Sequence, residues 1–289
     1  MLTEQQIKER KNYIGGSDCA AVLGMSRWGS PLTVWMEKTG QSEVKEENLA
    51  MKLGNKLEQI VAELFMEETG KKVRRVNETV FHPDYPFIGA NVDRKIEGED
   101  AILEIKTASG WKAKEWDDNE IPEEYILQVM HYLAVTGREK GYIAVLIGGN
   151  QDFKWKEIVR DNELVASIIE KEVLFWNNYV VPKVMPMTFT SIDGDPLGQL
   201  FSKPENLAIV PAIDDLNECF KDLEFTKNAI KELEDEKKSL ENRLKAEIGN
   251  NLGITTSKYQ ATWNIVKKEA HEVKASEYRM LRIKELKGE

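Results

Sequence analysis

Residues 87–106 read FIGANVDRKIEGEDAILEIK, and this segment combines a clear strand pattern with reactive side chains. Branched and aromatic residues stand on both sides of the turn sequence EGE, which predicts two strands joined as a hairpin. The first strand is expected over Phe87–Ile96, with Asp93 near its middle, and the second over Ala101–Thr107. Glu104 and Lys106 share one face of the second strand, because successive strand side chains point to opposite faces. The hairpin therefore brings two carboxylates and one lysine to a common edge.

Two carboxylates at this edge indicate a metal site on chemical grounds. Asp93 and Glu104 would repel each other in a partly apolar setting unless a cation lay between them. Ligation by oxygen atoms alone selects Mg²⁺ or Mn²⁺. The alternative is that both acids are ordinary solvent-facing strand residues and that Lys106 pairs with one of them across the ladder. The flanking elements must decide between the two.

The flanking elements are predicted helices that carry further polar side chains. Apolar spacing predicts a helix over Leu49–Glu68 that ends at Gly70, with Glu58 adjoining its buried side. A second helix opens at Pro122 and runs to about Val135. Gln128 and Tyr132 lie four residues apart on it and share a face.

The remaining pattern predicts a central sheet and a separate C-terminal region. Further strands are expected at Val73–Val76, Thr79–His82, Gly141–Ile147 and Phe153–Val159, and a further helix at Asn162–Tyr179. Proline and glycine cluster between about 183 and 213. We therefore expect a first domain over residues 1–185, a linker over 186–213, and an accessory region over 214–289.

The accessory region has a heptad pattern. Apolar positions recur at steps of three and four from Leu216 to Leu244, with Thr226 and Lys237 as imperfect positions, which predicts a coiled-coil-like helix. Ile254–Val266 is expected to form a hairpin, followed by a final basic helix. The row of apolar heptad positions, here called the seam, could fold back on the first domain, mediate assembly or recruit a partner.

Composition narrows the class of protein. The 289 residues hold 40 Lys and Arg against 50 Asp and Glu, a formal charge of −10, yet the basic residues are bunched, so a local basic groove remains possible. Two cysteines exclude a disulfide framework and a four-cysteine zinc site. No apolar run approaches the roughly 20 residues of a membrane span. No GxxxxGK[ST] motif occurs, which excludes an ATP-driven helicase-nuclease for this chain by itself.

The order of the polar residues resembles a known superfamily. A helical Glu58, a strand Asp93, a strand Glu104-x-Lys106 and a helical Gln128-xxx-Tyr132 are similar to the core of the PD-(D/E)xK nucleases. More narrowly, the chain resembles the lambda exonuclease and YqaJ branch of phage recombination nucleases. The resemblance covers roughly residues 5–182 and includes the blocks RKNYIGGSDCAAVLGMSRWGSPLTVWMEKTG, LGNKLEQIVAELF, GANVDRKI, EIKTASGWKAKEW and IPEEYILQVMHYLAVTG. It implies an α/β fold with a central mixed sheet flanked by helices.

The resemblance implies roles for individual residues. It assigns a catalytic set of Asp93, Glu104, Lys106, Gln128 and Glu58. Asp93 and Glu104 would ligate metal with the Ile105 carbonyl, and Glu58 would make an outer metal contact. Lys106 would act on the attacking water and on transition-state charge, and Gln128 would orient the site.

The resemblance also implies a pocket for a terminal phosphate. Arg10 and Ser17, seven residues apart, match the Arg and Ser of the family's 5′-phosphate pocket. The lambda enzyme has Ser where Asn91 stands here, and Val92 replaces the Pro of the motif name. Asn can still donate to phosphate.

Other DNA contacts are expected near the site. These are Lys112, Lys114 and Tyr132. Trp111 and Trp116 flank the two lysines. One ring could stack on or wedge between bases, and the alternative for one of them is packing in the core. Residues 15–18 could present N–H groups to phosphate at a helix start, or Ser17 or Asp18 could simply cap that helix.

The remaining aromatic, histidine and cysteine residues have structural interpretations. We expect His82, His131 and His271 to be structural, and Cys19 to pack on its helix. Trp28, Trp35 and Trp176 are expected in a core or an interface.

The resulting hypothesis is a Mg²⁺-dependent exonuclease with two ions, for which Mn²⁺ could substitute. By resemblance it would digest the 5′ strand of linear duplex DNA, leave a 3′ single strand for an annealing protein, and form a homo-oligomer, a trimer in the lambda relative. It would work in the cytoplasm of a bacterial host and be encoded by a phage or prophage. The alternatives are a structure-specific or nicking endonuclease, and a non-catalytic protein that binds a recombination partner.

Overall fold

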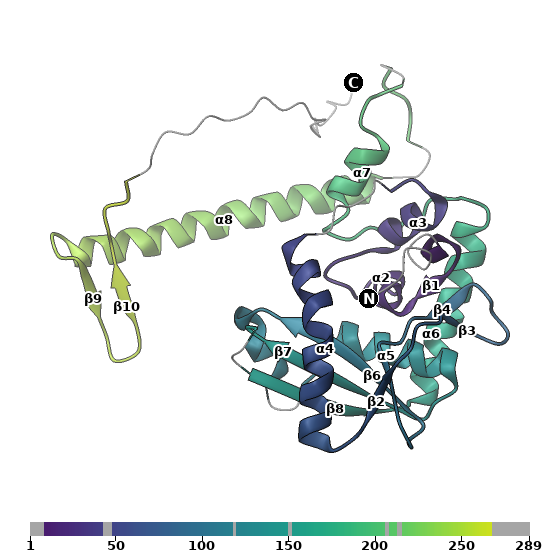
Figure 1. Cartoon of the computed structure of the whole chain (residues 1–289). Helices are drawn as coiled ribbons and strands as arrows, with labels where there is room; N and C mark the ends of the chain where they lie inside the picture. Colours follow the sequence, from purple (N-terminus) through teal and green to yellow (C-terminus); the bar gives the residue numbers. More distant parts are fainter. Residues whose placement is uncertain are drawn as a thin grey trace. The chain divides into compact units, whose positions relative to one another are not determined.

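The computed structural model describes residues 9–42, 48–117, 120–149, 152–205, 208–212 and 216–267. The chain divides into two compact units, Met1–Ser202 and Lys203–Glu289. Figure 1 shows the elements of each unit. The first unit therefore reaches into the segment that the sequence predicts as a linker.

The first unit is built on a five-stranded mixed sheet in the order β2-β5-β6-β7-β8. Its strands are β2 (Val73–Arg75), β5 (Arg94–Ile96), β6 (Ala101–Ala108), β7 (Lys140–Ile147) and β8 (Asp152–Val159). β6 and β7 run parallel, and the other neighbours run antiparallel. The predicted α/β fold with a central mixed sheet is confirmed.

Helices cover both faces of this sheet (Figure 1). α4 (Leu49–Thr69) begins at Asn48, whose side chain accepts a hydrogen bond from the Met51 N–H, and ends at Gly70 in the left-handed conformation. Its Phe65 packs with Leu103 on one face. α5 (Glu123–Thr136) and α6 (Asn162–Phe175) bury their apolar sides against the opposite face. The sheet is thus buried on both sides, which keeps the residues of β6 in fixed positions.

A second, smaller sheet changes the expectation for Phe87–Ile96. β4 (Ile88–Ala90) lies between β1 (Ile14–Gly15) and β3 (Val80–Phe81), whereas β5 belongs to the central sheet. The prediction of one continuous strand is wrong, because the two halves of the segment hydrogen-bond to different sheets. Asp93 lies at the break between them instead of mid-strand.

Short helices complete the first unit. These are η1 (Arg10–Asn12), α2 (Gly16–Val22), α3 (Pro31–Thr39), η2 (Gly110–Trp116), α7 (Gly194–Leu200) and the π-helical turn η3 (Trp176–Val180). Asp193, just before α7, is buried and accepts hydrogen bonds from the Ser30 hydroxyl and the Thr190 N–H. This part of the predicted linker is therefore packed into the first unit.

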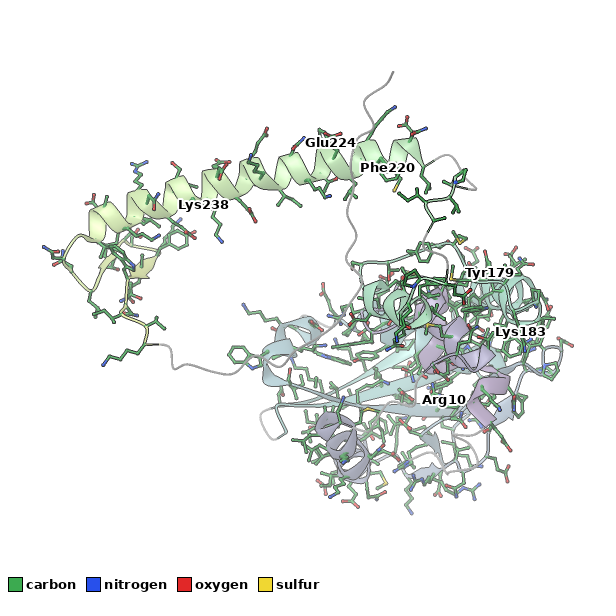
Figure 2. The ribbon with its side chains drawn as sticks, turned by 90° about the horizontal axis from the view of Figure 1, so that it is seen from above. Arg10, Tyr179, Lys183, Phe220, Glu224 and Lys238 are labelled. Atoms are coloured by element: carbon green, nitrogen blue, oxygen red, sulfur yellow. The ribbon has the colours of Figure 1, made fainter. Side chains whose placement is uncertain are left out.

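The second unit contains one long helix and a hairpin. α8 (Asn217–Ile248) is followed by β9 (Gly253–Thr255) and β10 (Gln260–Thr262), which pair antiparallel. The predicted hairpin is confirmed, with shorter strands. Figure 2 shows the side chains of α8 projecting all round the helix, and the seam residues Ile230, Leu233 and Leu240 are exposed. The predicted final basic helix lies outside the described residues.

None of the helices in the described part of the chain combines the length and the apolar character that a membrane span needs.

Candidate active site

Glu104, Lys106 and Gln128 form a tight group where β6 faces α5. The Lys106 ammonium lies 2.7 Å from Glu104 Oε1 and donates to Gln128 Oε1 at 2.8 Å. The Gln128 amide donates to Glu104 Oε1 at 2.7 Å and to the Tyr132 hydroxyl at 2.9 Å. The strand alternation and the helical spacing read from the sequence therefore bring these four side chains together.

Asp93 joins this group because the ladder between β5 and β6 is short. The strands pair at Arg94↔Leu103 and Lys95↔Ile102. One residue beyond that pairing, Asp93 Oδ2 accepts the N–H of Ile105 at 2.9 Å. The side chain thus takes the place of a strand partner, and its carboxylate comes beside Glu104.

The electrostatics of the group are unbalanced. Burial raises the pKa of Asp93 well above its ordinary value, and the neighbouring Glu104 charge raises it further, against the opposing effect of Lys106. Burial lowers the pKa of Lys106, but Glu104 outweighs this effect, so the net pKa is raised and the ammonium persists at neutral pH. One ammonium is thus shared by two crowded carboxylates.

The group fits a divalent cation. Within the described part of the chain, no donor reaches Glu104 Oε2, although this oxygen is buried. A buried carboxylate oxygen without a partner is costly, and a cation between Asp93 and Glu104 would remove that cost. Oxygen donors of this kind suit Mg²⁺ or Mn²⁺.

Glu58 approaches the same space from α4. Its Oε1 lies 2.5 Å from Arg94 Nη1 and 3.8 Å from Arg75 Nη2. Glu58 is a predicted site residue, but its partner Arg94 is not predicted from the sequence. The partner follows from β5 lying under α4, a pairing that no local pattern predicts.

A cavity of about 220 Å³ joins the group to a second set of polar residues. On the metal side its walls include Glu58, Asp93, Glu104 and Gln128. On the other side they include Arg10, Ser17, Asn91 and Tyr132. Eight of the residues predicted from sequence therefore border one cavity.

Arg10 and Ser17 are in contact, and a buried acid holds the arginine in place. Arg10 Nη2 donates to Ser17 Oγ at 2.7 Å and lies 3.1 Å from Asp18 Oδ1. Asp18 Oδ2 accepts from the Gly15 N–H at 3.0 Å and from Lys38 Nζ at 2.7 Å. Burial raises the pKa of Asp18, but Lys38 and Arg10 outweigh it and lower that pKa to about 2.

Asp18 caps the start of α2. Its side chain accepts the Gly15 N–H, so capping by Asp18 is confirmed, while phosphate binding by residues 15–18, which is compatible with it, stays a prediction. The contact of Asp18 with Arg10 is not predicted from the sequence. The sequence signal for the cap is an acid three residues after the N-cap position Gly15. No spacing rule links Lys38, which comes from α3, to this site.

Asn91 also borders the cavity and is held from two sides. Its amide nitrogen donates to the Tyr13 hydroxyl at 2.6 Å, and its amide oxygen accepts from the Thr79 hydroxyl at 2.8 Å.

Lys112 and Lys114 lie on η2 and are not part of the cavity wall. Of the flanking tryptophans, Trp116 is buried and stacks on Tyr125, whereas Trp111 is 98% exposed. Trp28, expected in a core or an interface, is 67% exposed, so it is not a core residue.

His131 is structural, as predicted. Its Nε2 donates to the Gly89 carbonyl at 2.9 Å, and its Nδ1 lies 2.8 Å from Glu172 Oε1. The buried ring thereby joins α5 to β4 and α6. Cys19 is buried next to this pair, also as predicted, and His271 lies outside the described residues.

Comparison with known proteins identifies the family of the chain. Residues 7–139 match the model of the YqaJ-like viral recombinase domain. Over 270 residues the chain is 43% identical to the Bacillus subtilis (strain 168) protein named "Uncharacterized protein YqaJ", and the alignment covers 92% of this chain and 84% of that protein. The chain belongs to the YqaJ family. The resemblance read from the sequence is therefore confirmed.

The fold of this YqaJ family member is also found in a solved nuclease structure. The alkaline exonuclease LHK-Exo from Laribacter hongkongensis is similar, with a TM-score of 0.55 and 24% identity, over 63% of this chain and 94% of that protein. A crystal structure of the same protein in complex with dAMP matches equally well. At 24% identity this likeness concerns the fold alone.

Proposed function

We propose that this protein is a Mg²⁺-dependent DNA exonuclease that hydrolyses phosphodiester bonds from the 5′ end of linear double-stranded DNA and leaves 3′ single strands. The observation that carries the proposal is the shared cavity. At one end its wall has crowded carboxylates, of which Glu104 pairs with Lys106 behind it, and at the other an arginine and a serine in contact. A terminal phosphate and the next phosphodiester of one strand could occupy the two ends together.

The metal side would perform the hydrolysis. Asp93 and Glu104 would hold Mg²⁺ with the Ile105 carbonyl, Glu58 would make an outer contact, and two ions are proposed, with Mn²⁺ as a substitute. Bound divalent cations lower the pKa of water and offset charge on the transferring phosphoryl oxygens.

Lys106 and Gln128 would assist that chemistry. Lys106 carries its proton between Glu104 and Gln128, so its ammonium can hold the attacking water or a phosphate oxygen. Gln128 orients both partners through its own hydrogen bonds.

The other side would select the 5′ end. Arg10 and Ser17 would donate to a terminal phosphate, with Asn91 and Tyr132 beside them. Lys112 and Lys114 would contact the DNA backbone outside the cavity.

We also propose the biological setting that the resemblance implies. The protein would act in the cytoplasm of a bacterial host as a phage or prophage product. It would assemble as a homo-oligomer, a trimer by resemblance, and pass its single-stranded product to an annealing protein.

The test is digestion of a linear duplex labelled at its 5′ ends, with and without Mg²⁺, beside a covalently closed circle of the same sequence. Release of mononucleotides from the linear DNA alone is the expected result. Cleavage of the circle would indicate an endonuclease. No cleavage of either DNA, or undiminished cleavage by Lys106→Ala, would contradict the proposal. Lys171→Ala, at an exposed position on α6, is the matched control.

A further inference from the structure

Two exposed tryptophans lie on or beside η2, the short helix that follows β6. Trp111 is 98% exposed and Trp28 is 67% exposed. Lys112, the neighbour of Trp111 in the chain, places its ammonium 4.2 Å from the centre of the Trp28 ring. Indole rings normally contribute to stability by burial, so two of them exposed around one lysine indicate a surface that binds a partner.

The segments that carry the two rings are fastened together. The Arg27 guanidinium, next to Trp28, binds Glu115 of η2 through two hydrogen bonds of 2.8 and 3.0 Å. It also donates to Glu124 of α5 at 3.0 Å. The exposed rings are therefore presented on a fixed frame.

This surface adjoins the candidate active site. η2 begins two residues after the end of β6, the strand that carries Glu104 and Lys106. Its last residue, Trp116, stacks on Tyr125 with ring centres 5.6 Å apart, and the Tyr125 ring centre lies 4.9 Å from Lys106 Nζ.

The charges of the surface favour an anion. The acids nearest to it are already paired, Glu115 with Arg27 and Asp117 with Lys154. In the described part of the chain, neither Lys112 nor Lys114 forms an ion pair with a carboxylate. The lysines are thus available to phosphates.

We propose that Trp28, Trp111 and Lys112 form a stacking platform that binds the unpaired bases of single-stranded DNA beside the nuclease centre. Every base has a face that an indole can stack on, so the platform would accept any sequence, while Lys112 would contact the backbone. This inference rests on the proposed nuclease function for its DNA substrate, but the platform can be tested by binding alone.

The experiment measures binding of the full-length protein in EDTA, which prevents cleavage. The probes are a fluorescein-labelled dT₁₂ and an abasic oligonucleotide with the same phosphates, followed by fluorescence anisotropy. We expect Trp111→Ala to weaken dT₁₂ binding about ten-fold and Trp28→Ala to weaken it by a similar factor. Both variants should bind the abasic probe as the wild type does. Trp111→Phe should recover most of the lost affinity, because it keeps an aromatic face.

Trp263→Ala is the matched control, since Trp263 is 55% exposed and lies in the second unit. Equal affinity of the wild type for the two probes, no binding of dT₁₂, or equal losses for Trp111→Ala and Trp263→Ala would overturn the inference. Nuclease assays on the same variants separate the two proposals. If the wild type cleaves DNA but Trp111→Ala binds dT₁₂ as tightly as the wild type does, the platform is excluded and the nuclease function stands. If Trp111→Ala weakens binding but the wild type cleaves no DNA, the proposed function is excluded and the platform stands.

Discussion

The two ends of the cavity treat buried charge in opposite ways. At the metal end, Asp93 and Glu104 share one lysine, and Glu104 Oε2 is buried without a donor from the described residues. At the phosphate end, Asp18 is bonded to the Gly15 N–H, Arg10 and Lys38. The first end has negative charge left to satisfy, whereas the second uses its acid to fix cationic groups. This difference in charge balance is the physical basis for the proposal that one end binds a cation and the other an anion.

The largest expected effect is the loss of hydrolysis at the metal end. Glu104→Gln keeps the shape of the side chain but removes the charge that would hold the cation. We expect the rate of mononucleotide release to fall by about 10³-fold. Glu170→Gln, at an exposed position on α6, should leave the rate unchanged. Equal rates for both variants would mean that the crowded carboxylates do not bind the catalytic cation.

The next effect concerns stability at the phosphate end. Asp18→Asn removes the buried charge partner of Lys38 and leaves it only the exposed Glu37 carboxylate at 3.1 Å, which should lower the free energy of unfolding by about 3 kcal/mol. Urea denaturation measures this change. Asp195→Asn, at an exposed position on α7, is the control and should change stability little.

The same carboxylate predicts a pH dependence. The pKa of Asp18 is lowered from 3.8 to about 2 in the folded protein, so the stability it contributes is present above about pH 4. That contribution should be lost as the pH falls from about 4 towards 2. Unfolding curves over this range should show the loss in the wild type and a smaller one in Asp18→Asn. A steeper loss in the variant would exclude the assigned ion pairs.

A smaller effect is expected on end recognition. Arg10→Ala removes the guanidinium that would bind a terminal phosphate. The preference for 5′-phosphorylated over 5′-hydroxyl ends should fall about ten-fold, measured as the ratio of kcat/KM values on the two substrates. The control is Arg243→Ala on α8. An unchanged ratio would show that this end of the cavity does not read the phosphate.

The smallest effect should have the opposite sign to that of Asp18→Asn. Because the pKa of Asp93 is raised in the folded protein, ionised Asp93 destabilises the fold at neutral pH. Asp93→Asn should therefore raise the Tm in EDTA by about 3 °C. Mg²⁺ should raise the Tm of the wild type and not that of the variant. A lower Tm for Asp93→Asn in EDTA would remove the contrast between the two ends.

The sequence predicted much of the fold and of the site because their signals are local. Strand alternation placed Glu104 beside Lys106, and helical spacing placed Gln128 beside Tyr132. The error in the predicted strands arose where one continuous strand pattern pairs with two different sheets. Residues 87–96 look like one strand, but they divide between two sheets, and Asp93 lies at the division.

The amino-acid sequence by itself thus determined the acid, lysine and amide that can meet on β6 and α5, since periodicity is a property of the backbone. Only the tertiary structure decided that Asp93 reaches Ile105, that Lys38 and Asp18 hold Arg10, and that Arg94 binds Glu58. It also decided that Trp116 is buried while Trp111 is exposed. These outcomes depend on which distant elements pack together, and that choice is made by burial and charge pairing across the whole unit.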